Sequence, residues 1–488
     1  MTETAKKKRG MPSSFTILLA LLAIVAVITV IVSGTSGGAV TAARLSDFCT
    51  APIKGFADAL PVCLFVMILG GFLGMMTETG ALDNGIAVLV QKLKGNEIML
   101  IPVLMLIFSL GGTTYGMCEE TVPFYALLAA TMMAAGFDPM VGAATVLLGA
   151  GCGCLGSTVN PFAVGAAVDA LTGVGIEVNQ SIIIGLGAVL WIVTTAMSIF
   201  FVMSYAKKVK ADKGSTILSM QELKDAEEAH GKAASEVHKE VKLTGRQKGV
   251  LIAFAFTFVV MIVGFIPLAD LNEGVANFFD AGAVYDADGN AVVQGWSALI
   301  TGLPIGQWYF DEASTWFFLM AVLIGIIGGL SEKQIVNTFI TGAADMMSVV
   351  LVIALARGIS VLMANTGLDV FVLDAAANAL AGLSGVIFAP MSFLVYFGLS
   401  FLIPSTSVSM PIMGPLAVKL GFSPEVMVMI FSAAIGVVNL FTPTSGAIMG
   451  GLALAKIEWT TWLKFALKLI VALSVVCAII LTVACVLI

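Results

Sequence analysis

Residues Gly111 to Phe124 read GGTTYGMCEETVPF and place two adjacent carboxylates, Glu119 and Glu120, between strongly apolar runs. Acidic side chains are costly in apolar surroundings, and in membrane proteins they mark substrate paths, ion paths or proton relays. The same segment carries the hydroxyl groups of Thr113 and Thr114. These four side chains are candidates for binding a solute, and the glutamates suit an ammonium group, a guanidinium group or a proton.

Three other polar segments interrupt apolar sequence: Gly149 to Phe162 (GAGCGCLGSTVNPF), Pro404 to Ser409 (PSTSVS) and Asn439 to Gly446 (NLFTPTSG). Breaks of this kind free backbone carbonyl and amide groups and add side-chain oxygens. Such groups can ligate a dehydrated cation or hold a carboxylate at a helix N-terminus. From these segments the candidate substrate-binding residues are Asn160, Ser405, Thr406, Ser407 and Thr444.

Arg357 lies in ALARGIS, within an apolar run. An unpaired guanidinium group there costs at least about 3 kcal/mol, so a carboxylate partner is expected. One interpretation is a structural ion pair with Glu119, Glu120 or Asp345. The other is a bidentate clamp on the carboxylate of a substrate.

The composition identifies the class of protein that holds these groups. Hydrophobic residues make up 59% of the chain, charged residues 11%, and the mean hydropathy is +1.03. These values are typical of a polytopic membrane protein and exclude a soluble globular domain. The only two histidines, His230 and His238, lie in a charged loop, which excludes histidine-based hydrolase motifs within the membrane.

The basic residues predict a topology. With a cytoplasmic N-terminus and an external C-terminus, 20 of the 24 Lys and Arg residues lie inside, as the positive-inside rule requires. The segment 207–248 becomes a cytoplasmic, solvated helical linker, and 249–332 an acidic segment with a small external hairpin around Asp288-Gly289. The nine predicted spans are 14–33, 56–77, 139–171, 181–205, 248–267, 314–330, 343–365, 424–455 and 460–487.

Two parts of the chain match at a nearly fixed offset. Thr79 and Thr366 are 287 residues apart, and Ser157 and Thr442 are 285 apart. The intervening span reverses the orientation of the second copy, and such inverted-topology repeats are typical of secondary transporters. The predicted parts are an N-terminal repeat (1–205, with a re-entrant helical hairpin at 97–135 and a broken span at 139–171), a linker (206–247), an extra span and external loop (248–313), and a C-terminal repeat (314–488, with a hairpin at 385–420 and a broken span at 424–455).

The motifs CEETVPFY, GSTVNPFAVGAA, ALARGISVLM, FLIPSTS and LFTPTSGAIMGGLALAKI occur in this order. The chain thereby resembles the YfcC-like group within the C4-dicarboxylate anaerobic carrier (DcuC) and basic amino acid antiporter families, in the ion transporter superfamily. The resemblance implies an all-α homodimer with scaffold and transport domains and an elevator-type motion. It also implies Ser-Asn-Thr clamps like those of related divalent-anion/sodium symporters. In this sequence the resemblance assigns these clamps to Ser157, Thr158 and Asn160, and to Thr442, Thr444 and Ser445.

We therefore expect a multi-pass secondary active transporter of the cytoplasmic (inner) membrane, by antiport or ion-coupled symport. The expected substrate is an amino acid, of the basic arginine or ornithine type, with a C4-dicarboxylate as the alternative. Neutral oxygens from Ser157, Asn160, Thr442 and Ser445 suit Na⁺, whereas Glu119 or Glu120 suits H⁺. A membrane-embedded enzyme and a passive channel are the contrasting classes. We expect no other cofactor and no nucleic-acid partner.

Overall fold

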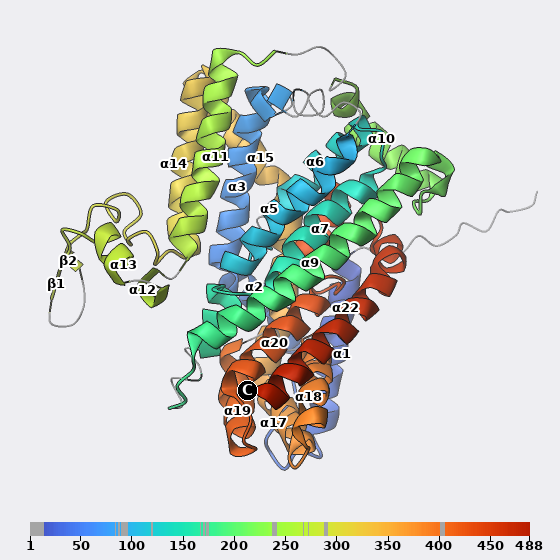
Figure 1. The fold of residues 1–488 in the computed structure, drawn as a ribbon, viewed down its shortest axis with the longest axis vertical. Helices are drawn as coiled ribbons and strands as arrows, with labels where there is room; N and C mark the ends of the chain where they lie inside the picture. Colours follow the sequence, from blue (N-terminus) through green and yellow to red (C-terminus); the bar gives the residue numbers. More distant parts are fainter. Residues whose placement is uncertain are drawn as a thin grey trace, which may run out of the picture.

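The computed structural model is almost entirely helical (Figure 1). It describes residues 14–82, 84, 85, 88, 96–118, 121–165, 167, 168, 171, 175–236, 242–266, 268–271, 273–286, 291–400 and 406–488. Within this part, seven helical stretches are long and apolar enough to cross a membrane: Leu60–Glu78, Glu97–Thr114, Gln180–Ala211, Gly245–Phe265, Phe310–Gly328, Met347–Thr366 and Trp459–Leu487. The predicted class of multi-pass, helical membrane protein is thus confirmed.

The first part of the chain begins with three helices, of which the first and the third correspond to the predicted spans 14–33 and 56–77. The elements are α1 (Ser14–Ser33), α2 (Leu45–Asp58), α3 (Leu60–Glu78), η1 (Glu97–Met99), α5 (Leu100–Tyr115), α6 (Val122–Ala134), α7 (Pro139–Leu155), η3 (Pro161–Gly165) and α9 (Gln180–Ala211). The two arms of the predicted hairpin correspond to α5 and α6. With η1, the first arm is long enough to count as a span, whereas α6 has only 13 residues. Re-entry of this hairpin stays a prediction.

The linker and the second part follow. Their elements are η4 (Lys213–Ser215), α10 (Met220–Glu236), α11 (Gly245–Phe265), α12 (Leu268–Leu271), α13 (Glu273–Phe279), β1 (Val284–Tyr285), β2 (Ala291–Val293), α14 (Phe310–Gly328), α15 (Glu332–Asp345), α16 (Met347–Thr366), α17 (Leu368–Leu380), α18 (Gly385–Leu399), α19 (Thr406–Lys419), α20 (Pro424–Val438), α21 (Gly446–Leu454) and α22 (Trp459–Leu487). Strands β1 and β2 pair antiparallel, which confirms the small hairpin. Its turn residues, Asp288 and Gly289, lie outside the described residues.

Helices in the two parts begin at matching offsets. Helices α2 and α15 begin 287 residues apart, as do α3 and α16, while α5 and α18, and α7 and α20, begin 285 residues apart. Helices α7 and α20 show why their starts match. Each has Pro at its first position and a capping side chain before it: Asp138 Oδ1 accepts from Val141 N at 3.1 Å, and Ser423 Oγ accepts from Val426 N at 3.4 Å.

The sequence reading missed two amphipathic helices, α2 and α15. Helix α2 packs tightly against α16 of the second part, and α15 packs tightly against α3 of the first part. A Cβ atom on Gly55 of α2 would lie 2.3 Å from Gly358 N of α16. A Cβ atom on Gly342 of α15 would lie 3.0 Å from Gly71 Cα of α3. Gly55 and Gly342 are 287 residues apart, and so are Gly71 and Gly358. The two crossings therefore use corresponding positions, and only glycine permits so close an approach of two helices.

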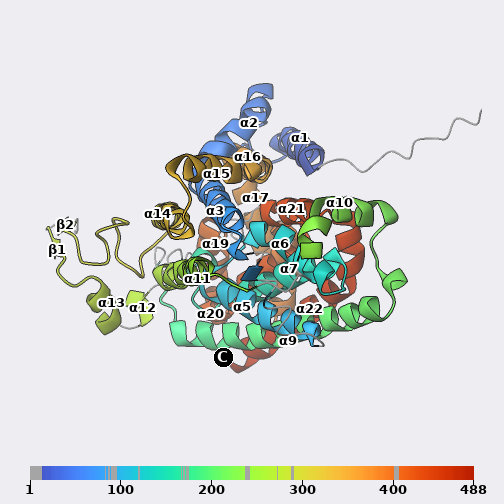
Figure 2. The same cartoon turned by 90° about the horizontal axis from the view of Figure 1, so that it is seen from above.

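The helices sort into two groups in the view from above (Figure 2). Helices α2, α3, α15 and α16 gather on one side, and α9 and α22 run along the opposite edge, with α5, α7 and α20 between them. Helices α11 and α14 pack on α3 through aromatic rings: Phe72 contacts Phe254, Phe258 and Phe317 with centroid distances of 4.9–6.1 Å. The small subdomain of α12, α13, β1 and β2 projects away from the bundle (Figure 1).

Candidate functional site

The first break in the helices follows Leu155 and is held by hydroxyl groups from the adjoining hairpin arm. Thr113 Oγ1 donates to Gly156 O at 2.6 Å and lies 3.2 Å from Thr158 Oγ1. In return, the backbone N and the Oγ1 of Thr158 donate to Thr113 O at 2.9 and 3.0 Å. Helix α5 comes this close to α7 because each helix has a glycine at the contact, Gly112 on α5 and Gly153 on α7. A Cβ atom on either would lie 2.2 Å from a backbone oxygen of the other helix. Two of the predicted residues, Thr113 and Thr158, are thus brought together.

Asn160 organises the end of the same break. Its Nδ2 donates to Ser157 Oγ at 2.9 Å, and its Oδ1 accepts from Ala163 N at 3.3 Å, which caps the short helical segment that follows. Gly116, at the end of α5, has a φ of 83°, and a Cβ atom there would lie 2.6 Å from Asn160 Oδ1. The hairpin tip therefore approaches the break closely, and both features require glycine at 116. Asn160 and Ser157 are buried.

The second break lies between α20 and α21 and is built from the same residue types. Thr442 Oγ1 and Thr444 Oγ1 are 2.7 Å apart, and Thr444 N donates to Thr442 Oγ1 at 3.3 Å. The freed carbonyls of Leu440 and Phe441 accept from the indole groups of Trp462 and Trp459 at 2.8 and 2.7 Å. Ser445 stands at the N-cap position of α21, where its side chain makes no capping hydrogen bond.

The two broken helices cross close to their breaks. A Cβ atom on Gly436 of α20 would lie 2.4 Å from Leu155 Cα, the last residue of α7. On the other side of the crossing, a Cβ atom on Gly151 would meet Leu440 Cδ2 at 2.3 Å. Ser432 Oγ donates to Cys154 O at 3.4 Å. The structure thus brings the two predicted polar breaks into one region, although they are about 285 residues apart in sequence.

The hairpin tips are described only in part. Thr114 Oγ1 donates to Leu110 O within its own helix at 2.7 Å. Glu119, Glu120 and Ser405 lie outside the described residues, and Thr406 and Ser407 begin α19 with side chains that are not described. The assignment of these residues to a substrate site stays a prediction.

Arg357 of α16 forms an ion pair with a carboxylate that the sequence reading did not consider. Its Nε lies 3.0 Å from Asp58 Oδ2 at the end of α2. Both side chains are partly exposed, 41% for Arg357 and 51% for Asp58. The guanidinium group therefore has an anionic partner, as expected. Asp345, one of the three partners considered, lies elsewhere in the fold.

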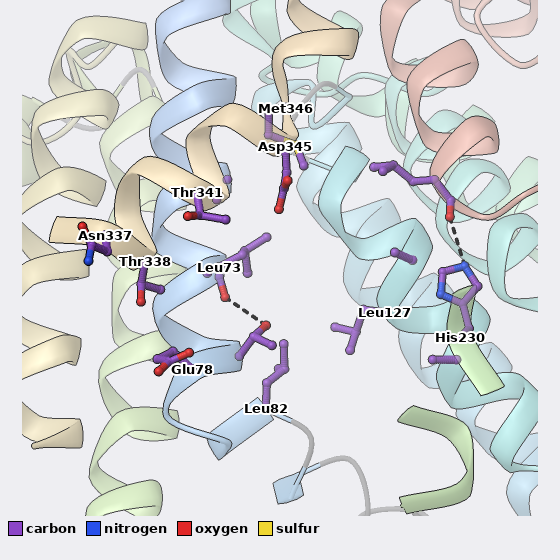
Figure 3. A pocket seen from close by; sticks show the side chains of 17 residues that line it. Leu73, Glu78, Leu82, Leu127, His230, Asn337, Thr338, Thr341, Asp345 and Met346 are labelled. Carbon is purple, nitrogen blue, oxygen red and sulfur yellow. Dashed lines mark hydrogen bonds between the residues drawn. The ribbon is translucent and has the colours of Figure 1, made fainter. Parts of the chain in front are cut away.

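A cavity of about 710 Å³ opens between α3 and α15 on one side and α6 on the other (Figure 3). Glu78, at the end of α3, and Asp345, at the end of α15, contribute two exposed carboxylates to its lining. Thr77, Asn337, Thr338 and Thr341 add further polar groups, and no Lys or Arg lies among the described lining residues. The cavity is therefore suited to a solute that carries positive charge.

The linker helix α10 forms one border of this cavity and is not simply a solvated connection. His230 Nε2 donates to Leu454 O of α21 at 3.0 Å, and Glu222 Oε1 accepts from Glu458 N at 2.9 Å. Ala226, between them on the same face, is fully buried. Burial lowers the pKa of His230 below its ordinary value of 6.5, and the hydrogen bond to Leu454 O only partly offsets this effect. The imidazole is therefore neutral near pH 7.

Sequence reasoning missed Asp58 and the cavity as functional candidates, and it considered Asp345 only as a structural partner of Arg357. A signal was present, because Asp58 and Asp345 are 287 residues apart, the same separation as Thr79 and Thr366. Its meaning depends on α2 and α15, which were not predicted. Both helices are short and carry charged residues, so neither has the long apolar run by which spans are recognised.

Comparisons with known proteins were made over the whole chain. The family model of the C4-dicarboxylate anaerobic carrier, DcuC, matches residues 38–486. An uncharacterised protein of Haemophilus influenzae is 28% identical over 445 residues, which cover 90% of this chain and 78% of that protein. The putative basic amino acid antiporter YfcC of Escherichia coli is 27% identical over 424 residues, which cover 84% of this chain and 74% of YfcC.

Two solved structures of membrane transport proteins are more distant. MtrF of Neisseria gonorrhoeae, from a class of antimetabolite efflux pumps, is 16% identical, with a TM-score of 0.45 over 98% of this chain and 96% of MtrF. The YdaH transporter of Alcanivorax borkumensis is 15% identical, with a TM-score of 0.47 over 96% of this chain and 97% of YdaH.

Proposed function

The chain belongs to the C4-dicarboxylate anaerobic carrier (DcuC) family, and on this premise we propose that it is a secondary active transporter that exchanges a basic amino acid, of the arginine or ornithine type, across the cytoplasmic membrane. The cavity beside α3 and α15 is the observation that carries the choice of substrate. It holds the carboxylates of Glu78 and Asp345, and no described lining residue is a lysine or an arginine. A dicarboxylate entering this space would be repelled, whereas a cationic solute would be concentrated there.

Two further observations support a cationic amino acid over a dicarboxylate. Arg357 of α16, the basic residue that could hold a substrate carboxylate, is already bound to Asp58. A dicarboxylate needs two cationic or donor sites, and this pairing removes the clearest one. One relative at 27% identity is a putative basic amino acid antiporter. The family description favours the alternative, a C4-dicarboxylate, and the experiment below separates the two.

The proposed mechanism uses the two parts of the chain as inverted repeats. Helices α2 and α15 cross α16 and α3 at corresponding glycines, which supports a two-fold relation between the parts. In this proposal the crossed breaks around Ser157 and Thr442 form the moving site, and α2, α3, α15 and α16 form the frame. The carboxylates of Glu78 and Asp345 on the frame meet the solute in the cavity on its way to that site. An elevator-type movement of the first group against the frame, in a homodimer, gives access to the solute from alternate sides.

Coupling to Na⁺ is the preferred form if transport is driven by an ion. Oxygens of Ser157, Asn160, Thr442 and Thr444 already cluster at the two breaks, and neutral oxygens of this type are ligands for such a cation. Coupling to H⁺ would instead require a titrating carboxylate. Replacement of Na⁺ by choline at constant pH distinguishes the two: sodium coupling predicts that uptake falls to background, and undiminished uptake contradicts it.

The function is tested with purified protein in lipid vesicles. Vesicles loaded with ornithine should accumulate labelled arginine against its gradient, and external succinate should not compete. Accumulation of succinate without any effect of arginine would establish the dicarboxylate alternative. An uncoupled, ohmic current would indicate a channel, and chemical conversion of the solute would indicate an enzyme.

A further inference from the structure

The two parts of the chain differ in charge at one pair of corresponding positions. Asp58 corresponds to Asp345, and Arg357 corresponds to Gly70, each pair being 287 residues apart. At the crossing of α2 and α16, the carboxylate of Asp58 holds the guanidinium group of Arg357. At the crossing of α15 and α3, the corresponding carboxylate of Asp345 and the corresponding Gly70 both line the cavity. We propose that Asp345 is a binding residue for the guanidinium or ammonium group of a free cationic solute, at the place that Arg357 occupies in the other half.

The chain itself provides the precedent for this ligand. The contact of Arg357 Nε with Asp58 Oδ2 at 3.0 Å shows that a carboxylate at the end of the amphipathic helix α2 can bind a guanidinium group beside the span that this helix crosses. The glycine contacts of the two crossings correspond as well. Asp345 therefore has similar surroundings, but α3, the span that α15 crosses, carries no basic residue.

The packing of α3 on α15 prevents a side chain at position 70, which corresponds to Arg357, from filling this place. A Cβ atom on Gly70 would lie 2.5 Å from Gly342 O and 2.4 Å from Met346 Cγ, so position 70 accepts only glycine. Figure 3 shows the side chain of Asp345 directed into the open space between α15 and α6. Within the described part of the chain, Asp345 forms no ion pair with a Lys or Arg. Among the described residues, none supplies a cation to this carboxylate, which leaves it open to a solute.

The surrounding groups suit a cation with a polar, extended body. Thr338 and Thr341 lie on the same helix as Asp345 and offer hydroxyl groups, and Glu78 provides a second carboxylate at the end of α3. His230 lines the cavity on the far side; its Nε2 already donates to Leu454 O, and its imidazole is neutral near pH 7. No positive charge among the described lining residues competes with the solute.

This inference rests on the proposed function, and it is tested by binding rather than by transport. The purified full-length protein is titrated with arginine, with agmatine, which has the guanidinium group but no carboxylate, and with succinate. We expect arginine and agmatine to bind and Asp345→Asn to weaken the binding of both by at least about tenfold, since hydrogen bonds to charged groups are among the strongest. Asp345→Glu should restore most of the affinity.

Asp374→Asn is the matched control, because Asp374 is an exposed carboxylate on α17 and does not line the cavity. This variant should bind arginine and agmatine like the parent protein. The melting temperature without solute verifies that each variant is folded. If Asp345→Asn binds both cations within about twofold of the parent, or if the parent binds arginine but not agmatine, the assignment of Asp345 is wrong while arginine transport can stand. If the parent binds succinate and neither cation, the proposed function fails together with the inference.

Discussion

Replacement of Gly342 by alanine should weaken the crossing of α15 on α3. A Cβ atom at this position would lie 2.4 Å from Gly70 O, 3.0 Å from Gly70 C and 3.0 Å from Gly71 Cα. All three atoms belong to the backbone of α3, so rotation of a side chain cannot relieve the overlap. The helices would have to separate by about 1 Å to reach ordinary van der Waals distances of about 3.5 Å.

The magnitude follows from two opposing effects. Overpacking of this kind costs about 1–3 kcal/mol, and the better helix propensity of alanine offsets up to about 1 kcal/mol. We expect Gly342→Ala to lower the free energy of unfolding by about 1–2 kcal/mol, and Gly55→Ala to do the same, because its Cβ would lie 2.3 Å from Ala354 O. The assay is the melting temperature of the purified protein in detergent, followed by intrinsic fluorescence.

Gly185→Ala in α9 is the matched control. A Cβ atom there meets no other atom within 4 Å, so only the gain in helix propensity remains, and the melting temperature should stay unchanged or rise. If Gly342→Ala and Gly185→Ala melt at the same temperature, the close approach of α15 and α3 is not present in the folded protein. The correspondence between the two crossings would then lose its basis.

Three further outcomes are expected. Asp58→Asn should lower the free energy of unfolding by no more than about 1 kcal/mol, because both partners of its ion pair are about half exposed and such pairs contribute little; a loss above about 2 kcal/mol in a thermal melt would contradict this. Docking of α10 lowers the pKa of His230 below its ordinary value of 6.5. Below pH 6.5 the undocked helix therefore binds more protons than the docked helix, so docking is fully stable above this pH and weakens below it. This is tested by introducing single cysteines into a protein without its seven native cysteines: Ala226→Cys at a buried position and Ala229→Cys as the exposed control. The rate at which a maleimide labels Ala226→Cys, divided by the rate for Ala229→Cys, should be higher at pH 5.5 than at pH 7.5. An equal ratio at both pH values would contradict the docking role of His230. In intact cells an impermeant maleimide should label Gln294→Cys in the external subdomain and spare Ala229→Cys, and labelling of both would contradict the topology predicted from the basic residues.

The sequence was most informative where a single residue type determines local geometry. The starts of α7 and α20 were predictable because GFDP and GFSP each place a capping side chain before a proline. The breaks after Leu155 and Val438 were predictable because Gly, Pro and Asn interrupt an apolar run there. In each case the signal lies within a few residues, so it survives without knowledge of the tertiary fold.

The sequence was least informative where function depends on which helices cross. Helix α10 reads as a charged, solvated segment, yet Glu222, Ala226 and His230 repeat at helical spacing and are all buried. Glu222 and His230 form hydrogen bonds to the corner between α21 and α22, more than 220 residues away in sequence, so their role cannot be read from the local pattern. The pairing of Arg357 with Asp58 likewise requires α2 to lie on α16, and neither the existence nor the position of α2 follows from its hydropathy.

The correspondence between the two crossings also distinguishes residues that serve helix packing from residues that serve recognition of the solute. Glycine at 55, 342 and 358 is explained by helix approach alone, since a Cβ atom there would meet the backbone of the facing helix, and Gly71 leaves room for the ring of Phe339. Arg357 has no such explanation, because Gly358 already provides the close contact on α16. The packing does not require the charge of Arg357, which lies beside Asp58. Asp345, the counterpart of Asp58, lines an open cavity instead, so the two otherwise matching crossings differ in charge. Arg357 neutralises Asp58 at the crossing of α2 and α16, whereas the crossing of α15 and α3 stays acidic. The cavity beside α15 and α3 is therefore the side at which an external cation is recognised.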